Sequence, residues 1–344
     1  MTNREKILSY ISAHPEVSSL EIFERAGVDV SYATVRRELG KLVSENLLVI
    51  TGNRKSSKYS LSPICALLQS VDIDTYFEKE IDDRTIVEGY NFSLIETLET
   101  APSIYTNSEA EKLMALQTRF SENFSKLTDN ARKSEMDRLG IDLSWKSSQI
   151  EGNTYSLLET ERLLKEKETA EGKTKDEAIM LLNHKDALDF ILGNPDYLTE
   201  LTVAKLENIH SILIKELDVD RNIRTHRVGI TGTNYRPLDN EFQIKEALEA
   251  TCRMVNSRDS IFEKALLILL IISYIQPFND GNKRTARIVS NAILIANNYC
   301  PVSFRSVDSI DYKKAMLIFY EQNNLSAFKR IFIDQFEFAV NTYF

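Results

Sequence analysis

The chain reads Gln276-Pro-Phe-Asn-Asp-Gly-Asn-Lys-Arg-Thr-Ala-Arg287 between two stretches that have the pattern of helices, 265–275 and 285–298. Pro277 and Gly281 interrupt the chain between them, so the segment forms a turn that leads directly into a helix N-terminus. Unpaired amide groups and the positive end of the helix dipole favour an anion at such a place. The stretch therefore predicts a helical body built around an anion-binding turn.

Basic and polar side chains gather at this turn. Arg287 follows Arg284 by three residues, so both guanidinium groups lie on one face of the helix. With Asn282 and Lys283 they predict a polyphosphate site, and Asp280 is placed to hold a Mg²⁺ ion between phosphate oxygens. A Walker A loop is excluded, because its spacing of Gly and Gly-Lys and its preceding strand are missing. The simpler alternative is a solvated basic helix start, which the length and order of the stretch disfavour.

The composition is that of a mainly helical globular protein with two or three domains. The chain has 344 residues, 43% hydrophobic and 27% charged, with only 11 Gly and 7 Pro. Cys65, Cys252 and Cys300 lie far apart and indicate buried thiols in a reducing compartment. The chain offers no signal-peptide core and no apolar run long enough for a bilayer, so we expect a cytoplasmic protein without a membrane partner.

The first 62 residues form a separate basic segment. They hold nine Lys or Arg and seven Asp or Glu, whereas the whole chain carries a net charge of −9. Helices are predicted over 4–13, 18–26 and 32–46, and strands over 47–51 and 58–61, an order that resembles a winged helix-turn-helix. The side chains that we expect to contact DNA lie on the third helix and in the wing: Tyr32, Thr34, Arg36, Arg37, Lys41, Arg54, Lys55 and Lys58.

One alternative accompanies this interpretation. A winged helix can also serve protein contacts, and no base sequence can be inferred. Most DNA readers of this kind bind as dimers, so a homodimer is expected.

The predicted fold class is mainly α: an N-terminal winged helix-turn-helix (1–62), a helical connecting segment (63–107) and an all-helical domain (108–344). The exception in the last part is 227–237, where alternating apolar residues around a Thr-Gly-Thr-Asn turn predict a short β-hairpin.

A second distinctive string is Ser147-Ser-Gln-Ile-Glu151-Gly152-Asn153, which reads as the end of a helix with a Gly-Asn cap. Glu151 stands in the last turn, where the helix dipole disfavours an anion. A carboxylate in that position suggests a positively charged partner elsewhere in the chain. The alternative is a solvated helix end.

The stretch 276–287 resembles the signature of the Fic family, His-Pro-Phe-x-Asp/Glu-Gly-Asn-Gly/Lys-Arg-x-x-Arg. Eleven positions fit, and Gln276 stands where the family has its catalytic His. In that family the His deprotonates a protein hydroxyl, which attacks the α-phosphate of ATP and receives AMP. The resemblance implies ATP and Mg²⁺ as ligands, with Asp280 on the metal. It further implies that the phosphates are held by Gly281, Asn282, Lys283, Arg284 and Arg287.

The resemblance covers about residues 108–340. The string at Ser147, Glu151 and Gly152 resembles the family's inhibitory motif, in which the Glu pairs with the second Arg of the loop, here Arg287. The segment 225–237 resembles the family's flap, with Thr231, Gly232, Thr233 and Asn234 at its turn. In the family this strip aligns a target protein segment by strand addition.

Gln276 alters the expected chemistry, because an amide cannot accept the proton that a general base removes. Losing such a base costs about 10²- to 10⁴-fold in rate. We therefore expect an ATP-binding, Glu151-inhibited, DNA-binding regulator with weak or absent AMP transfer. The alternative is an active protein adenylyltransferase acting on a Ser, Thr or Tyr hydroxyl, with His226 near the flap as a conceivable substitute base. Removal of AMP from a target is a third alternative, and it too would lack its acid at Gln276.

Overall fold

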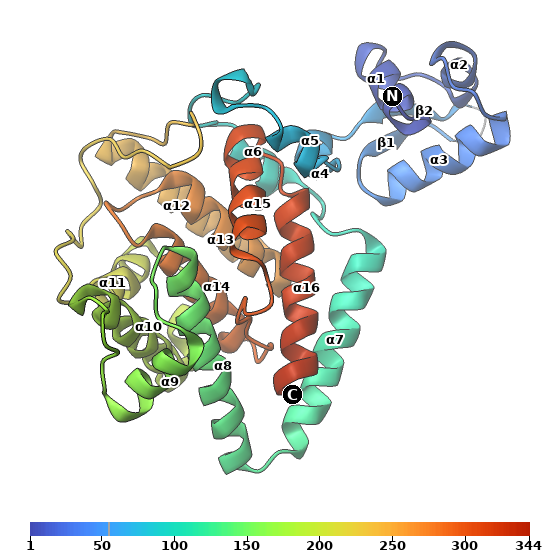
Figure 1. Cartoon of the computed structure of the whole chain (residues 1–344). Helices are drawn as coiled ribbons and strands as arrows, with labels where there is room; N and C mark the ends of the chain where they lie inside the picture. The colour runs from blue at the N-terminus through green and yellow to red at the C-terminus, as the bar shows by residue number, and fades with distance from the viewer. Residues whose placement is uncertain (54–55) are drawn as a thin grey trace.

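The computed structural model describes residues 1–53 and 56–344 (Figure 1). The N-terminal part begins with three short helices, α1 (Asn3–Ala13), α2 (Ser19–Arg25) and α3 (Tyr32–Ser44). The hydroxyls of Thr2, Ser18 and Ser31 cap them, which explains why each begins there. Strands β1 (Leu48–Thr51) and β2 (Lys58–Leu61) follow as an antiparallel pair in which Leu48 faces Leu61.

A connecting segment of small helices leads from this part to the body. It contains α4 (Cys65–Leu68), α5 (Ile73–Phe77), the 3₁₀ turn η2 (Ile81–Asp83) and α6 (Leu94–Thr100). Helix α6 buries Leu94 and Leu98 and packs against α12 of the body, while α5 packs against α15. The connecting segment is thus attached along the body rather than hanging free (Figure 1).

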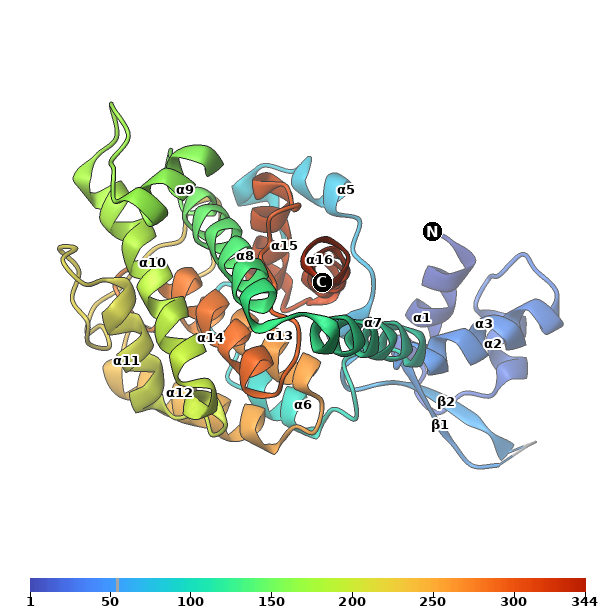
Figure 2. The ribbon, with the colours of Figure 1, turned by 90° about the horizontal axis from the view of Figure 1, so that it is seen from below.

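The body is helical throughout. Its elements are α7 (Asn107–Lys126), α8 (Asp129–Ile150), α9 (Leu157–Glu166), α10 (Lys175–Gly193), η3 (Pro195–Leu198), α11 (Val203–Leu213), α12 (Glu241–Ser257), α13 (Ile261–Ile275), α14 (Asn282–Ala296), α15 (Ser309–Gln322) and α16 (Ser326–Tyr343). Helix α13 is buried over nearly its whole length and packs most closely on α14. The other helices surround this pair (Figure 2). The mainly helical fold class predicted from the sequence is confirmed. Among the described residues, no helix is both long and apolar enough to cross a membrane.

The prediction of a β-hairpin at 227–237 was wrong. In the described part of the chain, the one sheet is the β1–β2 pair, and 227–237 is a loop with a turn at Thr231–Gly232. Its only bridge is an isolated parallel one between Arg236 and Gly89 of the connecting segment. The alternation of apolar residues was real, but these backbone groups pair with another segment instead of with each other.

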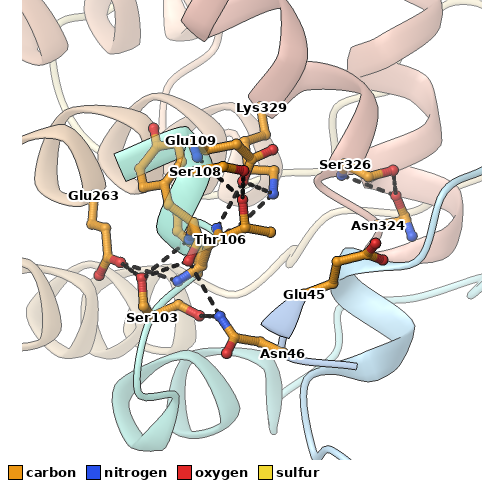
Figure 3. Close-up of polar contacts among 12 residues, drawn as sticks. Glu45, Asn46, Ser103, Thr106, Ser108, Glu109, Glu263, Asn324, Ser326 and Lys329 are labelled. Carbon is orange, nitrogen blue, oxygen red and sulfur yellow. Dashed lines mark hydrogen bonds and ion pairs between the residues drawn. The ribbon is translucent and has the colours of Figure 1, made fainter. Parts of the chain in front are cut away.

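Polar contacts fix the N-terminal part on the body (Figure 3). Asn46, which follows α3, donates to the carbonyl groups of Ser103 (3.3 Å) and Tyr105 (3.2 Å). Glu263 of α13, itself 3% exposed, accepts a 2.6 Å hydrogen bond from the Ser103 hydroxyl. Lys329 of α16 donates to the carbonyl group of Ile104, 3.2 Å away. The irregular stretch 103–105 is therefore the place where all three parts of the chain meet.

Candidate functional site

The turn between α13 and α14 depends on two left-handed residues, Gln276 (φ 51°) and Gly281 (φ 76°). A Cβ at Gly281 would lie 3.2 Å from the ring of His210, so a side chain there would crowd this ring as well as strain the backbone. His210 stacks on Phe278 with ring centroids 3.7 Å apart. Burial lowers the pKa of His210 to about 4, so this ring is a neutral support for the turn.

The side chain of Gln276 is 8% exposed and is held at both ends. Its Nε2 donates to the carbonyl of Ser273 (2.6 Å), and its Oε1 accepts from Asn282 Nδ2 (3.0 Å). Asn282 in turn accepts from the amide of Phe278 (2.8 Å). Gln276 and Asn282 therefore brace the turn from within.

Arg284 is 1% exposed but only partly paired. Its Nη2 lies 2.7 Å from Asp280 Oδ2, while its Nε and Nη1 have no hydrogen-bond partner among the described residues. Buried guanidinium donors without acceptors are costly, and an anion would satisfy them. The arrangement fits a phosphate group next to the start of α14, where Gly281 offers no side chain to cap the first amides.

Arg287 is completely buried, and each of its three guanidinium nitrogens has a partner. Its Nε donates to the hydroxyl of Ser147 (2.8 Å), and its Nη2 donates to the Ser147 carbonyl (2.9 Å) and to Glu151 Oε1 (2.8 Å). Its Nη1 donates to the hydroxyl of Tyr312, 3.2 Å away. The predicted pairing of Glu151 with Arg287 is thus present in the structure.

Glu151 is held between two cations. Its Oε2 lies 3.1 Å from Lys283 Nζ, in addition to the contact with Arg287. Burial alone would raise the pKa of Glu151, but the charges of Arg287 and Lys283 outweigh it and lower the pKa to about 2. The carboxylate is therefore ionised near neutral pH and neutralises two groups that the sequence assigns to phosphate.

A cavity of about 590 Å³ opens above these groups. Its floor and sides are residues 150–152, Gln276 and 279–284, and its remaining walls are 228–232 of the loop and Tyr312, Lys313, Met316, Leu317 and Tyr320 of α15. Among the described residues no histidine lines it. The volume and the mixed apolar and basic lining suit a ligand of nucleotide size.

The structure places only two of the four predicted flap residues at the cavity. Thr231 and Gly232 line the cavity, whereas Thr233 and Asn234 do not, and Asn234 donates to Asp82 of the connecting segment (2.9 Å). His226 is exposed and lies outside the cavity lining. It is therefore badly placed to replace a base at Gln276.

The sequence analysis missed two residues that hold the groups of this site in place. Arg224, 2% exposed, donates to the Gln276 carbonyl (2.6 Å) and to the carbonyl of Leu238, and so ties the turn to the loop. Tyr312 is buried, and its hydroxyl accepts from Arg287. Neither residue has a local motif, because each acts through partners that are distant in sequence.

A Mg²⁺ ion would require the ligand's own oxygens. Among the described residues, no group of three or more His, Cys, Asp or Glu side chains could hold a metal ion. The Asp280 side chain is 63% exposed at the cavity rim and could supply one carboxylate to an ion shared with phosphate oxygens.

The residues predicted to contact DNA lie mainly on the outer face of α3. Arg36, Arg37 and Lys41 are exposed, whereas Thr34 interacts with the capping Ser31 and Tyr32 Oη lies 2.8 Å from the hydroxyl of Ser19. Lys58 of β2 forms an ion pair with Glu21 at 3.4 Å. Arg54 and Lys55 lie outside the described residues.

Comparisons with known sequences find relatives of the part of the chain that contains the turn. Residues 200–294 match the model of the Fic/DOC family. The chain is 30% identical over 180 residues to the protein adenylyltransferase Fic of Nematostella vectensis, covering 48% of this chain and 40% of that protein. It is 26% identical over 159 residues to the protein of the same name from Drosophila melanogaster, covering 44% and 32%. The chain thus matches less than half the length of these curated relatives.

Solved structures show the same fold. Fic-1 (residues 134–508) from C. elegans superimposes with a TM-score of 0.60 at 21% identity, covering 73% of this chain and 80% of that one. A Fic domain containing signaling protein from Bacteroides thetaiotaomicron gives a TM-score of 0.58 at 18% identity, covering 67% and 95%.

Proposed function

We propose that this chain, whose residues 200–294 match the model of the Fic/DOC family, binds ATP with Mg²⁺ in its cavity and is autoinhibited by Glu151. The observation that carries the proposal is the buried Arg284, whose Nε and Nη1 lack partners among the described residues beside the first amides of α14. A triphosphate supplies the acceptors that these donors need. Gly281, Asn282 and Lys283 would then hold the inner phosphates, and Arg284 and Arg287 the outer ones.

Autoinhibition follows from competition for one guanidinium. Arg287 Nη2 is engaged by Glu151 at 2.8 Å, so it cannot donate to a terminal phosphate without losing that contact. Lys283 is partly neutralised in the same way. ATP binding thus has to displace a carboxylate, which reduces affinity or leaves the triphosphate badly placed. Bound Mg²⁺, held in part by Asp280, would offset phosphate charge.

We propose that AMP transfer is weak or absent. Transfer requires a target hydroxyl to lose its proton, its oxygen to attack the α-phosphorus, and pyrophosphate to leave. Gln276 cannot take that proton, and its amide is already used by Ser273 and Asn282. The second candidate is an active protein adenylyltransferase with a Ser, Thr or Tyr hydroxyl of a protein as acceptor. Two observations favour it: the relatives named above are called protein adenylyltransferases, and the match to the Fic/DOC family model includes this turn.

The proposal also covers the division of the chain into domains and the macromolecules that each domain binds. Residues 1–62 would form a winged helix that binds DNA through Arg36, Arg37 and Lys41, most readily as a homodimer. Residues 63–107 would connect it to a Fic domain spanning 108–344. A protein target would meet the cavity at the loop that includes Thr231 and Gly232.

The test compares the full chain with Glu151→Gly, Gln276→His and the double variant. Each is incubated with α-labelled ATP, Mg²⁺ and cell extract, and ATP affinity is measured separately by calorimetry. The proposal expects ATP binding in all four and labelled protein only where Gln276 is replaced by His. Labelling by Glu151→Gly alone would establish the second candidate. Absence of ATP binding in every variant would remove both.

A further inference from the structure

The cavity loop 227–237 is held by contacts from outside the matched family region. The Gly232 carbonyl accepts from Arg84 Nη1 (3.1 Å), the Asn234 side chain donates to Asp82 (2.9 Å), and the Arg236 amide donates to the Glu88 carbonyl (2.8 Å). All three partners belong to the connecting segment. Because residues 228–232 form one wall of the cavity, these contacts determine where that wall stands.

Arg84 is the most deeply anchored of the three partners. Its side chain is 9% exposed, and its guanidinium carbon lies 4.7 Å from the centre of the Phe77 ring. Its Nε donates to the carbonyl of Lys79 (3.2 Å), which fixes the plane of the guanidinium group. The direction of the bond to Gly232 is therefore set by packing rather than by the loop.

Arg84 also contacts the opposite wall. Its Nη1 lies 3.4 Å from Glu321 Oε1 at the end of α15, and Glu321 is 1% exposed. Glu321 additionally accepts a 2.6 Å hydrogen bond from the hydroxyl of Tyr76. Helix α15 supplies Met316, Leu317 and Tyr320 to the cavity. A single guanidinium group thus joins the loop wall to the helix wall.

The chemistry of this position favours arginine. Glu321 is a buried carboxylate that shares Nη1 with the Gly232 carbonyl, while the Lys79 carbonyl accepts from Nε on the other side of the guanidinium group. A guanidinium group offers several donors in one rigid plane, whereas an ammonium group is a single point on a flexible stem. A lysine at this position could neutralise Glu321 but could not hold all three acceptors.

We propose that Arg84 is a positioning residue for the cavity loop, and that the connecting segment rather than a hairpin fixes this loop for an incoming protein segment. The role of the loop in meeting a target rests on the proposed function. The fixation itself does not, because it depends only on contacts within the chain. Arg84 has no direct part in phosphate binding, since it lies outside the cavity lining.

The test is hydrogen–deuterium exchange of the full chain, read within 228–236 at the amides of Tyr235 and Arg236, which donate hydrogen bonds, and, as an internal reference, at the amides of α13. Arg84→Gln should speed exchange at 228–236 by about 10- to 100-fold, the effect of losing a charge-assisted hydrogen bond, and leave α13 unchanged. Arg84→Lys should give a smaller increase. The matched control is Arg227→Gln on the same loop, whose side chain is 82% exposed and pairs only with Asp239, and it should change nothing.

Arg84→Gln leaves Glu321 without its cation and could loosen the whole body. In that event the amides of α13 would also exchange faster. Asn234→Ala then separates local loosening of the loop from loosening of the whole body, because it removes the contact with Asp82 and leaves Glu321 unchanged. Faster exchange confined to 228–236 in Asn234→Ala and Arg84→Lys supports the inference. Unchanged exchange there in both variants overturns it. ATP affinity, measured in parallel, tests the proposed function alone.

Discussion

Glu151 Oε1 lies 2.8 Å from Arg287 Nη2, and this contact joins the end of α8 to the interior of α14 at the floor of the cavity. The two residues are 136 positions apart in sequence. The same carboxylate also reaches Lys283, so one anion occupies two of the cations that a triphosphate would use.

Replacing Glu151 should therefore strengthen nucleotide binding. We expect Glu151→Gly to raise ATP affinity by about tenfold or more, because a buried charge-assisted contact no longer competes with the ligand. Calorimetry with ATP and Mg²⁺ measures the change. The matched control is Glu161→Gln, which removes an exposed carboxylate from α9 that pairs with Lys165. Equal affinities of Glu151→Gly and the unmodified chain would contradict the competition.

The pair should also make stability depend on pH. The pKa of Glu151 is lowered from its ordinary value of 4.5 to about 2, so its contribution is complete above pH 4.5 and is lost as the pH falls towards 2. Urea unfolding at pH 7, 4 and 3 should show the unmodified chain losing its advantage over Glu151→Gln as the solution becomes acidic. A difference that stays constant from pH 7 to 3 would show that the carboxylate is not ionised against Arg287.

Gln276 should matter for stability as well as for chemistry. Gln276→Ala removes the partner of the Ser273 carbonyl and one of the two acceptors of Asn282 Nδ2, which keeps the Phe278 carbonyl, and this should cost about 1–3 kcal/mol. Chemical denaturation gives the value. Gln243→Ala, at an exposed position of α12, is the control and should cost less than about 0.5 kcal/mol. A similar loss in both variants would mean that the bracing contacts of Gln276 contribute nothing.

DNA binding can be tested on α3. Arg36→Ala and Arg37→Ala should each weaken binding to duplex DNA and lower the salt slope by about one, as for the loss of one phosphate contact. Fluorescence anisotropy with a random duplex at several salt concentrations measures both quantities. Arg162→Ala serves as the control because it removes an exposed cation from α9. If it reduced binding as much as the α3 variants, non-specific charge would explain the effect.

The attachment of the N-terminal part should depend on Asn46. Asn46 has a φ of 60°, so Asn46→Gly keeps the backbone conformation and removes only the two hydrogen bonds to Ser103 and Tyr105. We expect greater mobility of residues 1–62 relative to the body, seen as an increased radius of gyration by small-angle scattering. An unchanged scattering curve would assign the attachment to the apolar contacts of α4.

Local signals in the sequence predicted the local structure well. The helices predicted over 32–46 and 265–275 are found as α3 and α13, because helix signals depend on neighbouring residues. The pairing of Glu151 with Arg287 was reached through a family resemblance, since nothing in the spacing connects them. The hairpin at 227–237 failed because alternation shows which residues are extended but not which segment they pair with.

Buried arginines were the main omission. Arg84 and Arg224 each satisfy backbone carbonyl groups from segments far away in sequence. A charged residue between polar neighbours looks like a surface position, and only the folded chain reveals that its charge is enclosed.

The attachment of the cavity loop to residues 82–88 affects how this protein should be handled at the bench. A truncated chain starting at α7 would keep every residue of the phosphate turn. A comparison with the family signature would therefore not reveal that a segment is missing. It would nevertheless lack Asp82, Arg84 and Glu88, and its loop would be free to take other shapes. Target recognition measured on such a fragment would describe the fragment, so selectivity studies belong on a chain that retains this segment.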